Sequence, residues 1–122
     1  MTYYQNQISL TRDRFIPKDY LCDQVIAGKK FMDKNFTKKI SLNDIAKKAC
    51  ISKFHFLRLF KILYGRTPHQ YITAKRIEKA KQLLSNGSTV SEVCFTVGFE
   101  SISSFKGLFK LYTGHTPAYY RP

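Results

Sequence analysis

The feature that most constrains this sequence is an internal repeat. The stretch LFKILYGRTPHQY, Leu59 to Tyr71, returns as LFKLYTGHTPAYY, Leu108 to Tyr120, with seven of thirteen positions identical. Around both copies the apolar residues recur at the spacing of a helix face. Each copy then has a Gly, which suits a helix end, and a Thr-Pro pair, which suits a helix start. We therefore expect two copies of one helical unit.

The repeat is wider than these two stretches. The sequences SLND, at 41–44, and TVSE, at 89–92, both have the pattern of a capping box at a helix start. In each copy a short helix is followed by a turn, at Cys50 or Gly98, and by a longer helix that Ser52 or Ser101 would cap. A short helix, a tight turn and a longer helix form a helix-turn-helix. Glu100 is one extra residue in the second copy.

The rest of the chain is also expected to be helical. The apolar spacing predicts a first helix over about residues 17–36 and a long helix over about 68–84 between the two copies. The predicted fold class is all-α, with about seven helices and two helix-turn-helix subdomains joined by a linker helix. The expected boundaries are 1–16 for an N-terminal extension, 17–66 for the first subdomain, 67–86 for the linker helix and 87–122 for the second subdomain.

Charge narrows the class of partner. The chain has 21 Lys and Arg against 8 Asp and Glu, a formal charge of +13, which favours nucleic acid or an anionic membrane surface as the partner. No apolar run approaches the roughly 20 residues of a membrane span. Cys22, Cys50 and Cys94 are scattered and fit buried free thiols in a reducing cytoplasm. We expect no catalytic residues, cofactor or metal, because no such constellation stands out.

The apolar stripes predict which faces of the two longer helices point outward. The expected inward stripes are Phe56, Leu59, Phe60 and Leu63 in the first copy and Phe105, Leu108, Phe109 and Tyr112 in the second. The opposite faces hold Lys53, Phe54, Leu57, Arg58 and Lys61, and then Ile102, Ser103, Lys106, Gly107 and Lys110. The second helix of a helix-turn-helix can enter the DNA major groove, so these faces are candidates for contact with DNA.

The residue types on these faces suit bases. Arg58 can donate two hydrogen bonds to a guanine, while Phe54, Leu57 and Ile102 can contact thymine methyl groups and Ser103 can pair with several base edges. A rotation of the helix by one position would instead place the three apolar residues in the core. For Arg58, the separate alternative is an ordinary solvated surface charge.

A second set of residues suits phosphate. Lys61 and Lys110 are identical between the copies and lie at the far end of each face, where a phosphate contact would position the protein without specifying sequence. Solvated surface charges are the alternative for both. Thr67 and Thr116 fit structural caps best, although a helix N-terminus can also hold a phosphate. Arg76, on the linker helix, completes the expected phosphate contacts.

These motifs resemble a known family. SLNDIAKKACISKFHFLRLFKILYGRTPHQYI, RIEKAKQLL and VSEVCFTVGFESISSFKGLFKLYTGHTPAYYR are similar to the DNA-binding region of AraC/XylS-type transcription regulators, over about Tyr20 to Arg121. The resemblance implies two helix-turn-helix units that enter successive major-groove segments, about 34 Å apart, from one side of the duplex. It assigns base reading to Phe54, Leu57, Arg58, Ile102, Ser103, Lys106 and Gly107.

This chain differs from the family pattern at two positions of the outward faces. Relatives often carry Arg where this chain has Gly107, so we expect the second unit to discriminate fewer bases or to approach the DNA backbone more closely. Leu57 is apolar where polar readers are common. Because the two faces differ, the expected partner is double-stranded DNA with an asymmetric site.

The resemblance leaves the wider context open. RNA polymerase could be a second partner beside DNA. The residues do not distinguish an activator from a repressor. Relatives usually carry an effector or dimerisation domain, which here would lie outside this chain. We therefore expect a DNA-binding piece of a longer protein rather than a stand-alone regulator. A non-specific architectural DNA-binding protein and a protein-interaction module remain alternative functions.

Overall fold

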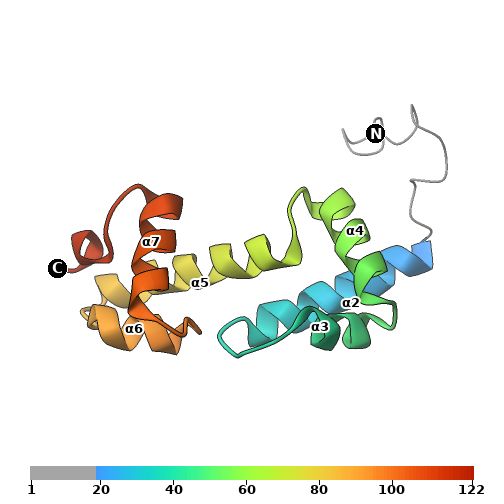
Figure 1. The fold of residues 1–122 in the computed structure, drawn as a ribbon, viewed down its shortest axis with the longest axis horizontal. Helices are drawn as coiled ribbons and strands as arrows, with labels where there is room; N and C mark the ends of the chain where they lie inside the picture. Colours follow the sequence, from blue (N-terminus) through green and yellow to red (C-terminus); the bar gives the residue numbers. More distant parts are fainter. Residues whose placement is uncertain (1–18) are drawn as a thin grey trace. The chain divides into compact units, whose positions relative to one another are not determined.

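The computed structural model describes residues 19–122, which form six α-helices, one 3-10 helix and no strand (Figure 1). The elements are α2 (Asp19–Asn35), α3 (Leu42–Ala49), α4 (Lys53–Tyr64), α5 (Pro68–Ser85), α6 (Val90–Thr96), α7 (Ile102–Thr113) and η2 (Pro117–Tyr120). The all-α prediction is confirmed. The predicted N-terminal extension, residues 1–16, lies outside the described residues. Among the described helices, none combines the length and the apolar character that a membrane span needs.

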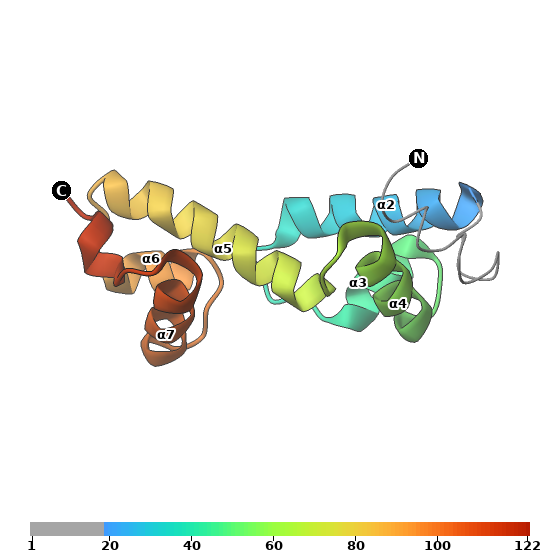
Figure 2. The ribbon, with the colours of Figure 1, turned by 90° about the horizontal axis from the view of Figure 1, so that it is seen from above.

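The helices form two compact units. The first contains α2, α3 and α4, and the second contains α5 from His69 onward, α6, α7 and η2. The segment Asn35–Ile40, which joins α2 to α3, belongs to the second unit. Within the first unit α3 packs on α4, and within the second unit α6 and η2 pack on α7 (Figure 2). The linker helix that the sequence analysis set apart is therefore part of the second unit for most of its length.

The starts of the two short helices follow the predicted capping boxes. The backbone N–H of Asp44 donates to Ser41 Oγ at 3.1 Å, and the backbone N–H of Ser41 donates to Asp44 Oδ2 at 2.9 Å. Thr89 and Glu92 make the same reciprocal pair before α6, at 3.2 and 3.3 Å. Hydrogen bonds from Ser41 hold the pKa of Asp44 below its usual value, and bonds from Thr89 do the same for Glu92. Both boxes satisfy backbone donors that a helix start leaves unpaired.

Each unit is built around a pair of phenylalanines on its longer helix. Phe56 and Phe60 are fully buried on α4, with ring centres 5.6 Å apart, and Phe105 and Phe109 are fully buried on α7 at the same 5.6 Å. The first core is completed mainly by Val25, Met32, Ile45, Ala46, Ala49 and Leu59. The second is completed mainly by Ile77, Ala80, Leu84, Val93, Cys94, Val97 and Phe99. The predicted stripes thus face inward at their phenylalanines.

The ends of both predicted stripes need correction. Leu63 is only half-buried, and Tyr112 is 41% exposed instead of lying in the core. In the second unit Tyr120, from η2, packs edge-on against Phe109 with ring centres 5.4 Å apart. That ring covers Phe109 from a different element, so Tyr112 is not needed there. The prediction that all three cysteines are buried holds for Cys94. It is wrong for Cys50, which is exposed at the end of α3, and Cys22 is only half-buried.

Two glycines within helices meet opposite surroundings and allow a direct test of the packing. A Cβ added at Gly28, on α2, would overlap the buried ring of Phe56, whereas a Cβ added at Gly107, on α7, would meet nothing within 4 Å. Alanine in a helix interior is favoured over glycine by up to about 1 kcal/mol. Gly107→Ala should therefore raise the free energy of unfolding by about 0.5–1 kcal/mol, and Gly28→Ala should lower it despite the better helix propensity.

Chemical denaturation of the two variants beside the wild type, followed by helical circular dichroism, measures both changes. The pair is its own control, because both substitutions add one methyl group to a helix interior. A stabilising Gly28→Ala would show that α2 does not pack on Phe56 as described.

Candidate nucleic-acid interface

The outward face of α4 combines positive charge with an exposed aromatic ring. Ser52 fixes the start of the helix by accepting a hydrogen bond from the backbone N–H of His55 at 3.1 Å, and Gly65 ends it. Phe54 is 72% exposed, and Lys53 Nζ lies 5.3 Å from the centre of its ring. Arg58 is exposed as well. The alternative that helix rotation buries Phe54 is therefore wrong.

Beside this face lies a mainly apolar groove of about 480 Å³. It is lined by Phe54, Leu57, Arg58, Lys61, Ile62 and Thr67. Leu57 is half-buried and forms part of the wall, while Arg58 and Lys61 are exposed. The groove therefore offers an apolar surface with two cations beside it.

The outward face of α7 has the same construction with fewer large side chains. Ser101 accepts a hydrogen bond from the backbone N–H of Ser104 at 3.1 Å, and Gly114 ends the helix. Ser103 and Lys106 are exposed. Ile102 is half-buried and packs against the second core, so the alternative core role holds in part for this residue.

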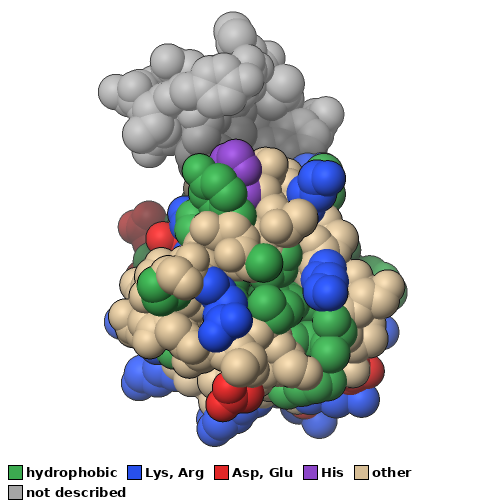
Figure 3. Space-filling model, turned by 90° about the vertical axis from the view of Figure 1, so that its left-hand side faces the viewer, with side chains coloured by type: hydrophobic (Ala, Val, Ile, Leu, Met, Phe, Trp, Pro, Cys, Tyr) green, Lys and Arg blue, Asp and Glu red, His purple; other side chains and the backbone are tan. Residues whose placement is uncertain are grey.

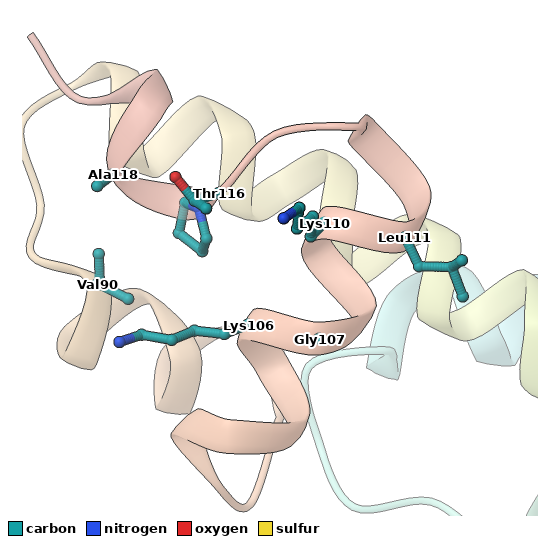
Figure 4. Close-up of a pocket in the computed structure, with 8 residues that line it drawn as sticks. Val90, Lys106, Gly107, Lys110, Leu111, Thr116 and Ala118 are labelled. Carbon is teal, nitrogen blue, oxygen red and sulfur yellow. The ribbon is translucent and has the colours of Figure 1, made fainter.

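A groove of about 610 Å³ lies beside α7 (Figure 4). Its lining is Val90, Lys106, Gly107, Lys110, Leu111, Thr116, Pro117 and Ala118. In Figure 4 the side chains of Lys106 and Lys110 project from α7 toward the side where Val90 and Thr116 lie. Gly107 leaves the backbone of α7 bare between these two lysines.

The two grooves occupy the same place in the repeated unit. The repeat pairs Leu57 with Lys106, Arg58 with Gly107, Lys61 with Lys110, Ile62 with Leu111 and Thr67 with Thr116. Each groove therefore runs beside the outward face of the longer helix and ends at the Thr-Pro pair. The main chemical difference is that the arginine of the first groove is absent from the second.

The outward faces of α4 and α7 carry positive charge and no negative charge. Neither α4, KFHFLRLFKILY, nor α7, ISSFKGLFKLYT, contains an Asp or a Glu. The acids nearest to these helices in sequence, Asp44, Glu92 and Glu100, lie in the preceding capping boxes and in a turn. Figure 3 shows one face of the molecule on which Lys and Arg side chains lie around hydrophobic ones, with few acids among them. Such a surface attracts a phosphate polymer.

The predicted phosphate contacts have different surroundings. Lys61, Lys110 and Thr116 are exposed at the groove edges, and the Thr116 side chain makes no capping hydrogen bond. Thr67 is half-buried before the first residue of α5. Arg76 is also half-buried, and its guanidinium donates to two backbone carbonyls of the segment 35–40.

Sequence reasoning missed two groove residues, Ile62 and Leu111. Leu111 is 77% exposed, the most exposed large apolar side chain among those described. Each lies one helical turn beyond the central residue of its face, Arg58 or Gly107, and residues four apart share a helix face. That spacing was available in the sequence. Within residues 19–122, no group of three or more His, Cys, Asp or Glu side chains is placed to hold a metal ion.

The fold matches solved structures of DNA-binding domains. An AraC-type DNA-binding-domain regulator from Chromobacterium violaceum is 26% identical, with a TM-score of 0.75, over 81% of this chain and 89% of that one. The DNA-binding domain of AdpA, solved in complex with a target DNA, is 28% identical with a TM-score of 0.73, over 85% of this chain and 91% of that one.

Sequence comparison gives the same answer. A family model described as a helix-turn-helix domain matches residues 45–122. The transcriptional activator AarP of Providencia stuartii is 35% identical over 92 residues, which are 75% of this chain and 68% of AarP. The chain belongs to the AraC-type family of helix-turn-helix transcription regulators. The chain spans only 37% and 44% of the length of two other curated relatives.

Proposed function

We propose that this AraC-type chain binds double-stranded DNA in a sequence-specific manner and so regulates transcription, acting by binding and not by catalysis. The observation that carries the proposal is the pair of equivalent outward faces, on α4 and α7, that hold cations beside exposed apolar groups and no acid. AdpA, a structural neighbour, was solved with a target DNA bound to the corresponding domain.

In the first unit the base readers are Phe54, Leu57 and Arg58, with Lys53 at the start of the helix. The guanidinium of Arg58 is exposed and can donate two parallel hydrogen bonds to a guanine. The exposed ring of Phe54 and the half-buried Leu57 offer apolar contact to thymine methyl groups. This face can therefore distinguish base pairs by both polar and apolar contacts.

In the second unit the readers are Ile102, Ser103 and Lys106, beside Gly107. The hydroxyl of Ser103 pairs with more than one base edge, and Ile102 has only its outer part free because it packs against the core. Gly107 contributes no side chain where Arg58 stands in the first unit. We therefore assign most of the sequence discrimination to α4, and an asymmetric site follows from the unlike faces.

The phosphate contacts that we propose are Lys61, Lys110, Thr67 and Thr116, at the edges of the two grooves. Phosphate contacts fix the register of a protein on the duplex and carry no sequence information by themselves. We leave Arg76 out of this set, because two of its donors already bond to backbone carbonyls.

The wider role follows from the family. We propose that the chain acts in the cytoplasm, with RNA polymerase as the second partner, and that an effector or dimerisation domain, where one exists, lies outside it. The chain spans less than half the length of two relatives, which supports a separate domain for such a role.

Two other functions share some of the same surface. The bare backbone at Gly107 favours a non-specific architectural DNA-binding protein, which needs phosphate contacts alone. The exposed Phe54 and Leu111 favour a protein-interaction module. DNA affinity separates them, since an architectural protein binds all duplexes alike and an interaction module binds none tightly.

Selection of bound duplexes from a random library, at about 150 mM salt with competitor DNA, tests the proposal. Enrichment of an asymmetric motif with two clusters about one helical turn apart supports it. Tight, salt-sensitive binding without enrichment supports the architectural function, and absence of binding supports the interaction module.

Arg58 and Lys110 should behave differently when truncated. Arg58→Ala should weaken binding to the selected site by about 1–3 kcal/mol and relax the preference at one base position. Lys110→Ala should weaken binding to all sequences alike and reduce the salt dependence by about one ion. Titrations of both variants on specific and random duplexes at several salt concentrations measure this. Equal losses on both duplexes for Arg58→Ala would remove it from the base readers.

Gly107→Arg should add to the second unit what Arg58 gives to the first. The Cβ position is open, so the new side chain extends from the outward face of α7 without displacing a neighbour. Repeating the library selection should reveal a new preference worth about 1–3 kcal/mol at one position of the second cluster. Gly107→Ala is the matched control, because it fills the backbone position without adding a guanidinium. A uniform gain in affinity with no new preference would show that this position faces only the DNA backbone.

A further inference from the structure

Arg76 lies on the linker helix, outside the outward faces of α4 and α7, and its side chain is already engaged within the protein. Its Nε donates to the carbonyl of Phe36 at 2.6 Å, and its Nη2 donates to the carbonyl of Lys38 at 3.0 Å. The guanidinium lies 5.8 Å from the centre of the Phe99 ring. Burial lowers the pKa of Arg76, and nearby Glu100 opposes that shift. A planar fork with several fixed donors suits two adjacent carbonyls, and a lysine would not reproduce it.

The segment that Arg76 holds is also fixed from the turn between α6 and α7. Gly98, with φ +108°, lies so close to it that an added Cβ would stand 2.8 Å from the Thr37 carbonyl oxygen and 3.0 Å from Arg76 Nε. Glu100 forms an exposed ion pair with Lys39 at 3.3 Å. Residues 36–39 are thus packed between the linker helix and this turn, all within the second unit.

The chain path gives this packing a consequence. The segment Asn35–Ile40 belongs to the second unit, but the chain enters it from α2 and leaves it into α3, both of which belong to the first. The two units are therefore joined after Lys34, after Ile40 and after Pro68. If the segment were released from the second unit, only the last of these junctions, the one at α5, would still lead directly into that unit.

We infer that Arg76 is a positioning residue that anchors the α2–α3 segment to the second unit and so limits the motion of one reading unit against the other. The inference rests on the proposed function. Two linked binding modules gain affinity only when their connection suits the distance between their sites, and a looser connection lowers the effective concentration of the second module. Loss of the anchor should weaken binding to the complete site and make the protein more tolerant of altered spacing.

The test compares Arg76→Lys and Arg76→Ala with Lys79→Ala, which removes the same charge from an exposed position on the same helix. Binding is measured on duplexes whose two clusters are separated by the selected spacing and by one base pair more or fewer. Wild type and Lys79→Ala should lose about tenfold or more in affinity on the altered spacings. Both Arg76 variants should bind the selected spacing more weakly and show a flatter spacing profile.

A second variant keeps Arg76 and its contacts intact. Insertion of three glycines between Ile40 and Ser41 leaves the anchor in place and loosens only the junction to α3, so it should also flatten the profile without disturbing the second core. Amide NMR relaxation of the free proteins gives a readout without DNA. Wild type should tumble with one rotational correlation time, and the Arg76 variants should show separate, shorter ones for the two units.

A spacing profile and relaxation data for Arg76→Ala that match the wild type would overturn the inference, as would a wild type that tolerates every spacing. Failure of the library selection to find any motif would instead contradict the proposed function. The relaxation comparison would then still decide whether Arg76 anchors the segment.

Discussion

The structure depends on the burial of one pair of phenylalanines in each unit. Phe56 with Phe60, and Phe105 with Phe109, are fully buried with the same separation of ring centres. Burying such rings is among the largest favourable terms in a small core. Because each pair fixes the rotation of its helix, it also fixes which residues of α4 and α7 point outward. The candidate DNA-binding faces therefore follow from the packing of the opposite faces.

This constraint explains which parts of the repeat are alike and which differ. The caps, the phenylalanines, the Gly ends and the Thr-Pro pairs recur because both copies must fold in the same way. The outward positions are under no such constraint, and there Arg58 is paired with Gly107 and Leu57 with Lys106. A protein that reads two unlike groove segments with one type of unit needs this combination of a repeated scaffold and divergent faces.

Much of the fold could be predicted because its signals are local. The capping boxes at Ser41 and Thr89 and the helix ends at Gly65 and Gly114 depend on residues within one helical turn of each other. The outward position of Phe54 followed from helix periodicity alone.

The parts that could not be predicted depend on contacts between residues distant in sequence. Tyr120 packs on Phe109, and Tyr112 is left exposed. The spacing of apolar residues within α7 could not predict this, because Tyr120 belongs to another element. The hydrogen bonds of Arg76 to the segment after α2 join residues about 40 positions apart, so the sequence alone led us to expect a phosphate contact from this arginine.

The central claim is that the outward faces of α4 and α7 bind DNA, and amide chemical-shift mapping with a selected duplex tests it most directly. If they do, the largest shifts should cluster on the first turns of α4 and α7 and on the Thr-Pro ends of the two grooves, and the shifts on α2 should be smaller. Shifts concentrated instead on Phe95 or Tyr119, which are exposed outside both faces, would contradict it.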